Sequence, residues 1–453
     1  MFWNRTLEAV GSTPIGSTIS QGGLTTPPFF FDISLRSSLK GDGQNFDEGH
    51  GRLGGSMSSV LWVTSSVGLC LQWAIIHFGG FHLAPEWQAL SAGMAIFGAS
   101  FMLSWSAELA QLDIPQALAL ALLALIAVLP EYAVDMYFAW MAGKDPSYTA
   151  FATANMTGAN RLLIGVGWAT VVFAFWLKTR QRAVKLEPGH KIEVLYLGLA
   201  TLYSFFIPLK GRLDLFDAVV FIAIFVLYMR RAAQAAHVEP ELEGPPETIA
   251  GWGTGPRRAI TIGFFLLSGY TIFIAAEPFA EGLLASGRRF GIEEFVLVQW
   301  LAPLASESPE FIVAILFALR ANPGASIGTL ISSKINQWTL LIGMLPVVYA
   351  VSLGRLSPMQ MDDRQVEELL LTAAQSVFAV AVLSDLSFAV GEALLLFALF
   401  ATQLLIPDPQ FRYYYAFGYI LLALGWVGLK RGCREAVVAL FARDENPRAA
   451  NEK

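Results

Sequence analysis

The sequence predicts an all-α polytopic membrane protein of about 12 transmembrane helices, arranged as two inverted five-helix repeats plus one extra helix at each end. Three observations carry this prediction. The chain of 453 residues is 55% hydrophobic and only 15% charged, a composition typical of multi-span membrane proteins. Apolar windows of about 20 residues follow one another along most of the chain. Two of these windows, far apart in the sequence, also carry acidic residues after a proline.

The windows that are long enough to cross a bilayer begin at residue 58. We expect spans at residues 58–79, 86–107, 114–141, 149–177, 191–209, 213–230, 259–285, 292–319, 325–353, 366–384, 387–406 and 411–429. The first repeat covers residues 86–230 and the second, inverted repeat covers residues 259–406. The segments 57–80 and 411–429 supply the two extra helices.

Three segments are too polar to cross the membrane. Residues 1–56 are rich in Gly, Ser and Thr, which predicts a disordered cytoplasmic tail. Residues 231–258 are rich in Pro, Gly and Glu, and they are interpreted as a cytoplasmic linker that is too short to form a domain. Residues 430–453 are expected to form a second cytoplasmic tail.

The distribution of basic residues predicts the orientation of the chain. If the N-terminus is inside, the inner segments hold 20 lysines and arginines and the outer loops hold 8. This bias places both termini in the cytoplasm and favours a multi-pass protein of the inner or plasma membrane. The two remaining basic residues, Arg161 and Lys334, lie inside predicted spans.

The most polar pair of spans lies in residues 301–343, with a turn at Asn322-Pro323-Gly324. Its polar residues include Ser306, Glu307, Glu310, Ser333, Lys334 and Gln337. Glu307 and Glu310 are three residues apart and therefore share one helical face. A charged group at membrane depth costs about 3 kcal/mol on insertion scales, so such groups usually serve a function there.

A second copy of this pattern lies in residues 126–167, where Glu131 and Asp135 precede Arg161. Glu131 aligns with Glu310 at an offset of 179 residues. Each repeat holds five spans, and an odd number of spans inverts the second repeat relative to the first. The sequence therefore predicts a transport site at the interface of two inverted repeats.

Two motifs, each present in both repeats, resemble those of the cation/calcium exchanger superfamily and its sodium/calcium exchanger group. Each repeat of that group carries Gly-[Ser/Thr]-Ser-x-Pro-Glu on one helix and Gly-Ser-Asn-x-x-[Asn/Asp] on the next. The resemblance covers residues 86–406. The matching positions are Pro130-Glu131, Gly158, Asn160, Ser306, Pro309-Glu310 and Ser333.

Several positions depart from this family pattern. Glu307 replaces a serine and Lys334 replaces an asparagine, while the last Asn/Asp position reads Leu163 in one repeat and Gln337 in the other. We interpret Arg161 and Lys334 as tethered charges that stand beside the glutamates in place of bound cations. Fewer ions would then move in each cycle.

The resemblance implies a secondary active antiporter that moves Ca²⁺ or another cation against Na⁺ or H⁺ by alternating access. Glu131 and Glu310 are candidate metal ligands, because each follows a proline that frees a backbone carbonyl, and hard oxygens suit these ions. The residues expected to bind or couple ions are Glu131, Asp135, Asn160, Arg161, Ser306, Glu307, Glu310, Ser333, Lys334 and Gln337. We expect membrane lipid and small cations as partners, no nucleic acid and no resident cofactor, with the oligomeric state open.

A non-transporting membrane protein with the same fold is the main alternative. Its four carboxylates would pair with Arg161 and Lys334 in a salt-bridged core, although buried pairs are poor stabilisers. Four carboxylates against two cations leave a charge of −2, which one divalent ion, two monovalent ions or protonation could balance. A membrane enzyme is disfavoured, because the sequence contains no HExxH motif and no cluster of histidines that could hold a metal.

Overall fold

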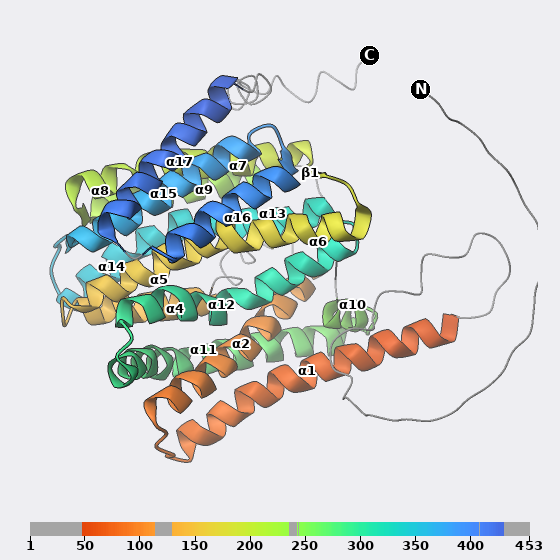
Figure 1. The fold of residues 1–453 in the computed structure, drawn as a ribbon. Coiled ribbons are helices and arrows are strands. Elements are labelled where there is room, and N and C mark those ends of the chain that lie inside the picture. Colours follow the sequence, from red (N-terminus) through yellow and green to blue (C-terminus); the bar gives the residue numbers. More distant parts are fainter. Residues whose placement is uncertain (1–47, 114–128, 235–241, 243, 407, 430–453) are drawn as a thin grey trace, which may run out of the picture. The chain divides into compact units, whose positions relative to one another are not determined.

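The computed structural model describes residues 48–113, 129–234, 242, 244–406 and 408–429, which Figure 1 draws as coloured ribbons and short coloured connections. Most of the predicted N-terminal tail, the predicted C-terminal tail and the first half of the span expected at 114–141 lie outside these residues. The predictions of disorder and of a complete third span therefore stay predictions.

Helices account for nearly all of the described chain. The first half contains α1 (Glu48–Phe78), α2 (Pro85–Ala110), α4 (Leu129–Ala142), α5 (Tyr148–Leu162), the π-helix η1 (Leu163–Trp168), α6 (Ala169–Thr179), the 3₁₀ turn η2 (Pro188–His190), α7 (Lys191–Ser204), α8 (Phe206–Lys210) and α9 (Leu215–Ala232). The second half contains α10 (Pro245–Ala250), α11 (Thr254–Phe290), α12 (Glu294–Leu319), α13 (Pro323–Asn336), the π-helix η3 (Gln337–Leu341), α14 (Ile342–Leu353), α15 (Asp363–Leu383), α16 (Val390–Leu404) and α17 (Pro409–Leu429).

Eight helical segments in the described part of the chain are long and apolar enough to cross a membrane. They are Ser58–Phe78, Pro85–Ala110, Tyr148–Thr179, Pro188–Lys210, Thr254–Phe290, Glu294–Leu319, Gly324–Leu353 and Asp363–Leu383. Val390–Leu404 is a shorter apolar helix. The structure is thus that of a multi-pass helical membrane protein, while the count of twelve spans stays a prediction.

The structure adds helical detail to two segments that were predicted as a tail and a linker. The first helix begins at Glu48, inside the segment predicted to be a tail. The predicted linker contains a helix of its own, α10, whose Pro245, Pro246 and Ile249 are buried. The prolines favour the start of a helix here, and the apolar side chains give this helix a surface that packs. A hydrogen bond of 2.9 Å between Thr248 Oγ1 and Ser59 Oγ connects it to α1.

Two short antiparallel ladders connect the loops between helices. The strand β1 (Ala183–Lys185) pairs with β4 (Ser387–Ala389), and β2 (Arg212–Leu213) pairs with β3 (Met359–Gln360). Each ladder joins two connections that the predicted topology places on the same face of the membrane. The described connections therefore pair as the predicted up-and-down order of the spans requires. Which of the two faces is cytoplasmic stays a prediction.

An ion pair makes a further contact of this kind between the end of α2 and the start of α11. Arg257 Nη2 lies 2.8 Å from Asp113 Oδ1, and Arg258 Nε lies 3.0 Å from the same oxygen. Hydrogen bonds from Arg257 and then Arg258 hold the pKa of Asp113 below its ordinary value. The carboxylate therefore stays ionised, and the contact persists, throughout the neutral range.

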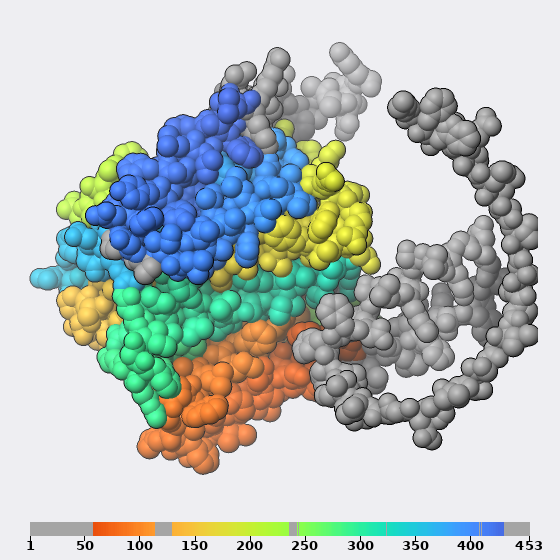
Figure 2. All heavy atoms as spheres, viewed as in Figure 1, coloured from red at the N-terminus to blue at the C-terminus, as the bar shows by residue number. Residues whose placement is uncertain are grey.

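Large apolar side chains cover parts of the surface. On α17, Phe417, Leu421 and Leu424 are each more than half exposed, and this helix belongs to the dark blue surface in Figure 2. An apolar surface of this kind suits contact with lipid tails rather than with water.

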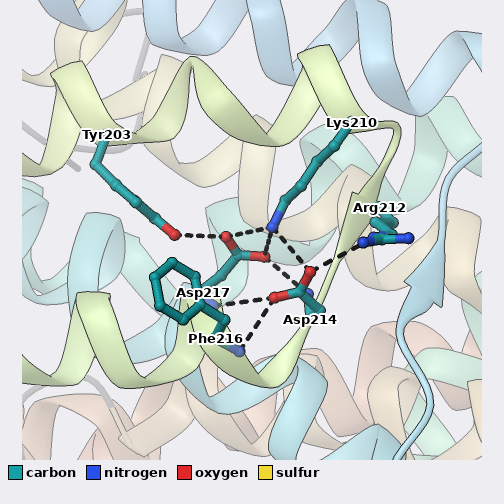
Figure 3. Close-up of polar contacts among 6 residues, drawn as sticks. All are labelled: Tyr203, Lys210, Arg212, Asp214, Phe216 and Asp217. Atoms are coloured by element: carbon teal, nitrogen blue, oxygen red, sulfur yellow. Dashed lines mark hydrogen bonds and ion pairs between the residues drawn. The ribbon is translucent and has the colours of Figure 1, made fainter.

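A polar network closes the turn between α8 and α9 (Figure 3). The Lys210 ammonium donates to both carboxylate oxygens of Asp217 at 2.6 Å and to Asp214 at 3.0 Å. Asp214 caps the N-terminus of α9, while Tyr203 donates a hydrogen bond of 2.8 Å to Asp217. Asp217 is fully buried, so the ammonium and the hydroxyl compensate for its desolvation.

Asp217→Asn should lower the free energy of unfolding by about 2 kcal/mol, because it removes the buried half of the lysine pair. Arg212→Ala is the matched control, since Arg212 is half exposed and lies 3.5 Å from Asp214. Thermal unfolding of both variants in the same detergent measures the difference. Equal melting temperatures for Asp217→Asn and the parent would show that the network contributes no stability.

Candidate cation-binding site

Four acidic side chains from two helices form what we call the acidic cluster: Glu131, Asp135, Glu307 and Glu310. Glu131 and Asp135 are one turn apart on α4, and Glu307 and Glu310 are one turn apart on α12, which also contains Pro303 and Pro309. The helices α4, α5 and α12 contact one another (Figure 1). Glu131, Asp135 and Glu307 are buried, and Glu310 is partly buried.

The members of the acidic cluster lie close enough to repel one another. Glu131 interacts electrostatically with Glu307, Asp135 and Glu310, and Glu307 interacts with Glu310 and Asp135. Among the described residues, however, no three side chains of His, Cys, Asp or Glu converge tightly enough to hold a metal ion. A cation that used several of these carboxylates would therefore need them to move together.

Many oxygens in and around the acidic cluster accept no hydrogen bond from the residues that the structure describes. These oxygens are Glu131 Oε1 and Oε2, Asp135 Oδ2, Asn155 Oδ1, Glu307 Oε2, Glu310 Oε2 and Gln337 Oε1. Buried acceptors are normally paired, because an unpaired one costs the desolvation of that group. A concentration of unpaired carboxylate and amide oxygens at one place fits a site that takes protons or a hard cation.

Lys334 supplies the positive charge beside the acidic cluster. Its side chain is fully buried, and the ammonium donates to Asn160 Oδ1 at 2.7 Å and lies 4.3 Å from the ring centroid of Trp338. Its electrostatic partners are Glu307 and Glu131. Asn160 and Lys334 occupy equivalent motif positions, so the two copies of the motif meet directly at this contact.

Lys334 and its neighbour Ser333 serve different residues. Ser333 interacts with Glu310, whereas Lys334 contacts Asn160 on α5. Successive residues of a helix point about 100° apart, so neighbours in the sequence serve different partners. The first carboxylates affected by removal of Lys334 are therefore those of Glu307 and Glu131.

Gln337 is joined to the acidic cluster directly. Its amide donates a hydrogen bond to Glu307 Oε1 and another, of 3.3 Å, to Ser333 Oγ. Ser306 is also buried, but its hydroxyl points back along its own helix to Ala302 O at 3.3 Å. A ligand role for Ser306 thus stays a prediction.

Two residues outside the predicted site lie in or next to it. Asn155 donates a hydrogen bond of 2.9 Å to Asp135 Oδ1, and Tyr132, which follows Glu131 in the sequence, donates one of 3.2 Å to Asn336 Oδ1 on α13. Asn155 is a polar residue inside an apolar span, and Tyr132 follows Glu131 directly. Both signals were present in the sequence, but helix-to-helix hydrogen bonding accounted for such residues equally well.

Arg161 does not stand beside the acidic cluster. Its guanidinium pairs with Glu368 of α15, with an N–O distance of 2.7 Å, and lies 5.0 Å from the ring centroid of Trp300. The prediction of a second tethered cation at the glutamates is therefore wrong, for the same helical reason: Asn160 faces Lys334, and the next residue faces another helix. Four carboxylates then stand against one cation, a formal charge of −3.

Both motif-bearing helices widen into a π-helix just after the motif. On the first, η1 begins at Leu163, three residues after Asn160, and on the second, η3 begins at Gln337, three residues after Lys334. Short π-helical turns inside α-helices are frequently found at functional sites. This shared feature supports the interpretation that the two elements are copies of one unit.

Gly158 brings α5 and α12 into very close contact. A Cβ atom at this position would lie 1.8 Å from the carbonyl oxygen of Gln299. Only a residue without a side chain therefore allows the two backbones to approach so closely, which sets the distance between the helices that carry Asn160 and Glu307.

Gly158→Ala should lower the free energy of unfolding by about 3 kcal/mol, because the clash is with backbone and cannot be relieved by a side-chain rotation. Gly418→Ala on α17 is the matched control, since a Cβ there would meet nothing within 4 Å. Thermal unfolding in detergent compares the two. An unchanged melting temperature for Gly158→Ala would contradict the close approach of α5 and α12.

Comparison with known proteins agrees with this geometry. The family described as "Sodium/calcium exchanger protein" matches residues 87–232 and 260–407. The chain is 46% identical to a solved H⁺/Ca²⁺ exchanger CAX, with a TM-score of 0.81 over 84% of this chain and 97% of that one. Native YfkE, at 14% identity and a TM-score of 0.56 over 80% of this chain and 100% of that one, shares the fold.

No curated protein matches the chain. The family match nevertheless covers well over half of its length, in two segments that each contain one copy of the acidic motif. The chain belongs to the sodium/calcium exchanger family of membrane transporters.

Proposed function

We propose that this protein is a secondary active antiporter that exchanges Ca²⁺ for H⁺ at the acidic cluster. The observation that carries the proposal is the set of buried oxygens without hydrogen-bond donors among the described residues. Protons and hard cations such as Ca²⁺ are kinds of cargo that such oxygens accept. The similarity to a solved H⁺/Ca²⁺ exchanger at 46% identity supports the same choice of ions.

The charges of the site support an exchange of one divalent ion for protons. With all four carboxylates ionised and Lys334 protonated, the buried charge is −3, which cannot stay uncompensated away from water. One Ca²⁺ together with one proton balances this charge, and so do three protons. Exchange of Ca²⁺ for two protons therefore keeps the site neutral in both loaded states.

Lys334 favours H⁺ over Na⁺ as the coupling ion. Its ammonium already interacts with Glu307 and Glu131, and it occupies the motif position where the family pattern has an asparagine oxygen. A fixed cation beside these carboxylates competes with a bound Na⁺. A lysine, unlike an arginine, can also shed a proton in a buried site, so Lys334 itself is able to take part in the exchange.

Alternating access would follow from two inverted repeats that meet at Asn160 and Lys334. In transporters of this design, one unit rocks against the other around a site near the midplane. The π-helical segments η1 and η3 end the motif helices at equivalent places and give each repeat a deformable point. We also propose that both termini are cytoplasmic, with the protein in the inner or plasma membrane, from its distribution of basic residues.

A non-transporting protein with a salt-bridged core fits the contacts less well. A closed core would pair each carboxylate with a cation or a donor, because breaking such pairs is strongly destabilising. Arg161 instead pairs with Glu368, and both oxygens of Glu131 are left without a described donor. The acidic cluster is thus poorly suited to a purely structural role.

Radioactive Ca²⁺ uptake into proteoliposomes tests the proposal. Vesicles with an acidic interior should accumulate Ca²⁺, and an imposed Na⁺ gradient at equal pH should drive no uptake. Uptake that follows the Na⁺ gradient and ignores pH would overturn the choice of H⁺. The absence of Ca²⁺ uptake under both gradients would favour the non-transporting alternative.

A further inference from the structure

A polar cavity lies between the ends of several helices, and none of the four residues of the acidic cluster lines it. Its volume is ≈ 510 Å³, and its walls come from α5, α12, α15, α16 and α17. The volume is within the usual range for small-ligand sites. Gln299, whose backbone is in close contact with Gly158, lines this cavity.

The walls of this cavity carry both signs of charge. Arg412 pairs with Glu367 and Glu368, each at an N–O distance of 3.1 Å. Arg161 pairs with the other oxygen of Glu368 at the inner end, and Arg364 pairs with Glu293. Three arginines face an equal number of paired glutamates, and Asp363 adds a further negative charge, so the cavity is not a simple anion site.

The same cavity presents buried amide groups that lack partners. Gln299 is 3% exposed and Gln403 is 8% exposed, yet neither Gln299 Nε2 nor either polar atom of the Gln403 amide has a hydrogen-bond partner among the described residues. Arg364 Nε is likewise buried and unpaired. Buried donors of this kind cost free energy unless a ligand or water meets them.

Part of the cavity wall is apolar and ends at an exposed leucine. Leu404 and Ile406 line it at the end of α16, and Leu405 between them is 80% exposed. The charged lining residues Glu293, Asp363 and Arg412 lie next to helix ends, and lipid headgroups meet membrane proteins at the ends of their spans. An occupant would therefore meet polar walls at one end and lipid tails at the other.

We propose that this cavity binds the headgroup of a zwitterionic phospholipid, with phosphatidylethanolamine as the best fit. The phosphate is held by Arg364 and by the N–H groups of Gln299 and Gln403, while the ammonium is held by Glu293 and Glu367. The acyl chains leave past Leu404. A headgroup with one anion and one cation matches walls of mixed charge, whereas a free anion or an anionic lipid would meet the glutamates without compensation.

Thermal unfolding and native mass spectrometry of the delipidated protein in detergent test this site. Phosphatidylethanolamine should bind at one saturable site and raise the melting temperature, while phosphatidylglycerol and inorganic phosphate should not. Gln403→Leu and Arg364→Gln should each weaken this binding about tenfold. Gln360→Leu is the matched control for Gln403→Leu, because Gln360 is an exposed residue on β3. A melting curve without added lipid shows that each variant is folded.

Two results would overturn the proposal. Equal affinity of the parent and of Gln403→Leu for phosphatidylethanolamine would show that the lipid binds elsewhere. A larger stabilisation by inorganic phosphate than by the lipid would show that the cavity is a site for a free anion. Soluble phosphoethanolamine should compete with the lipid, since the headgroup alone makes all of the proposed polar contacts.

Discussion

Glu131→Gln and Glu310→Gln should each reduce Ca²⁺ uptake to background while the protein stays folded. Glutamine keeps the volume and one oxygen of the side chain but removes the charge and the ability to carry a proton. Calcium affinity depends strongly on the number of charged ligands, so Ca²⁺ binding should weaken by about 100-fold. The two positions are equivalent in the two motifs, which predicts effects of similar size.

Glu392→Gln is the matched control for these two substitutions. Glu392 is also buried, but its carboxylate accepts a hydrogen bond of 2.8 Å from the backbone of Ala389 at the start of α16. The oxygen of a glutamine can accept the same bond, so uptake should persist. Parental uptake by Glu131→Gln or Glu310→Gln would remove that glutamate from the mechanism.

Lys334→Ala should bind Ca²⁺ about tenfold more tightly than the parent and should show a weaker dependence on pH. Removal of the ammonium takes away a positive charge that interacts with Glu307 and Glu131, so a metal ion no longer competes with that charge for them. Titration calorimetry with Ca²⁺ and Na⁺ at several pH values measures both effects. The gain is expected at Glu307 and Glu131 rather than at Glu310, because Ser333 faces Glu310.

Lys334→Arg tests whether Lys334 acts through its positive charge or through the release of its proton. An arginine keeps the positive charge and does not release its proton, so Ca²⁺ binding should stay weak and transport should be lost if Lys334 takes part in the exchange. A folded Lys334→Ala protein with parental ion affinities and a parental pH profile would contradict the tethered-cation role. Loss of folded protein in both variants, seen in a thermal melt, would instead assign Lys334 to structure.

The main helices could be predicted from the sequence because apolar length alone determines where a chain crosses a membrane. The turn at Asn322-Pro323-Gly324 was confirmed as the break between α12 and α13, where Asn322 accepts a hydrogen bond from the backbone of Ala325. Proline and asparagine at a helix start have local physical reasons that need no tertiary information. The short helix α10 was missed because its burial depends on packing against other segments.

The acidic cluster could also be expected from the sequence, since charges inside apolar spans are rare and tend to gather. The partners of Arg161 and Lys334 could not be predicted from the sequence. Arg161 and Lys334 each lie on a helix surrounded by several others, and a change of one position along a helix turns a side chain toward a different neighbour. For this reason Glu368, far along the chain on α15, was not expected to bind Arg161.

Proton release on Ca²⁺ binding is the most direct test of the account, whose central claim is that Ca²⁺ and protons share the same buried carboxylates. Purified protein in a weakly buffered detergent solution near neutral pH should release about two protons for each Ca²⁺ bound. Glu131→Gln and Glu310→Gln should release fewer, and Glu392→Gln should release as many as the parent. Stoichiometric Ca²⁺ binding to the parent without any proton release would contradict the claim.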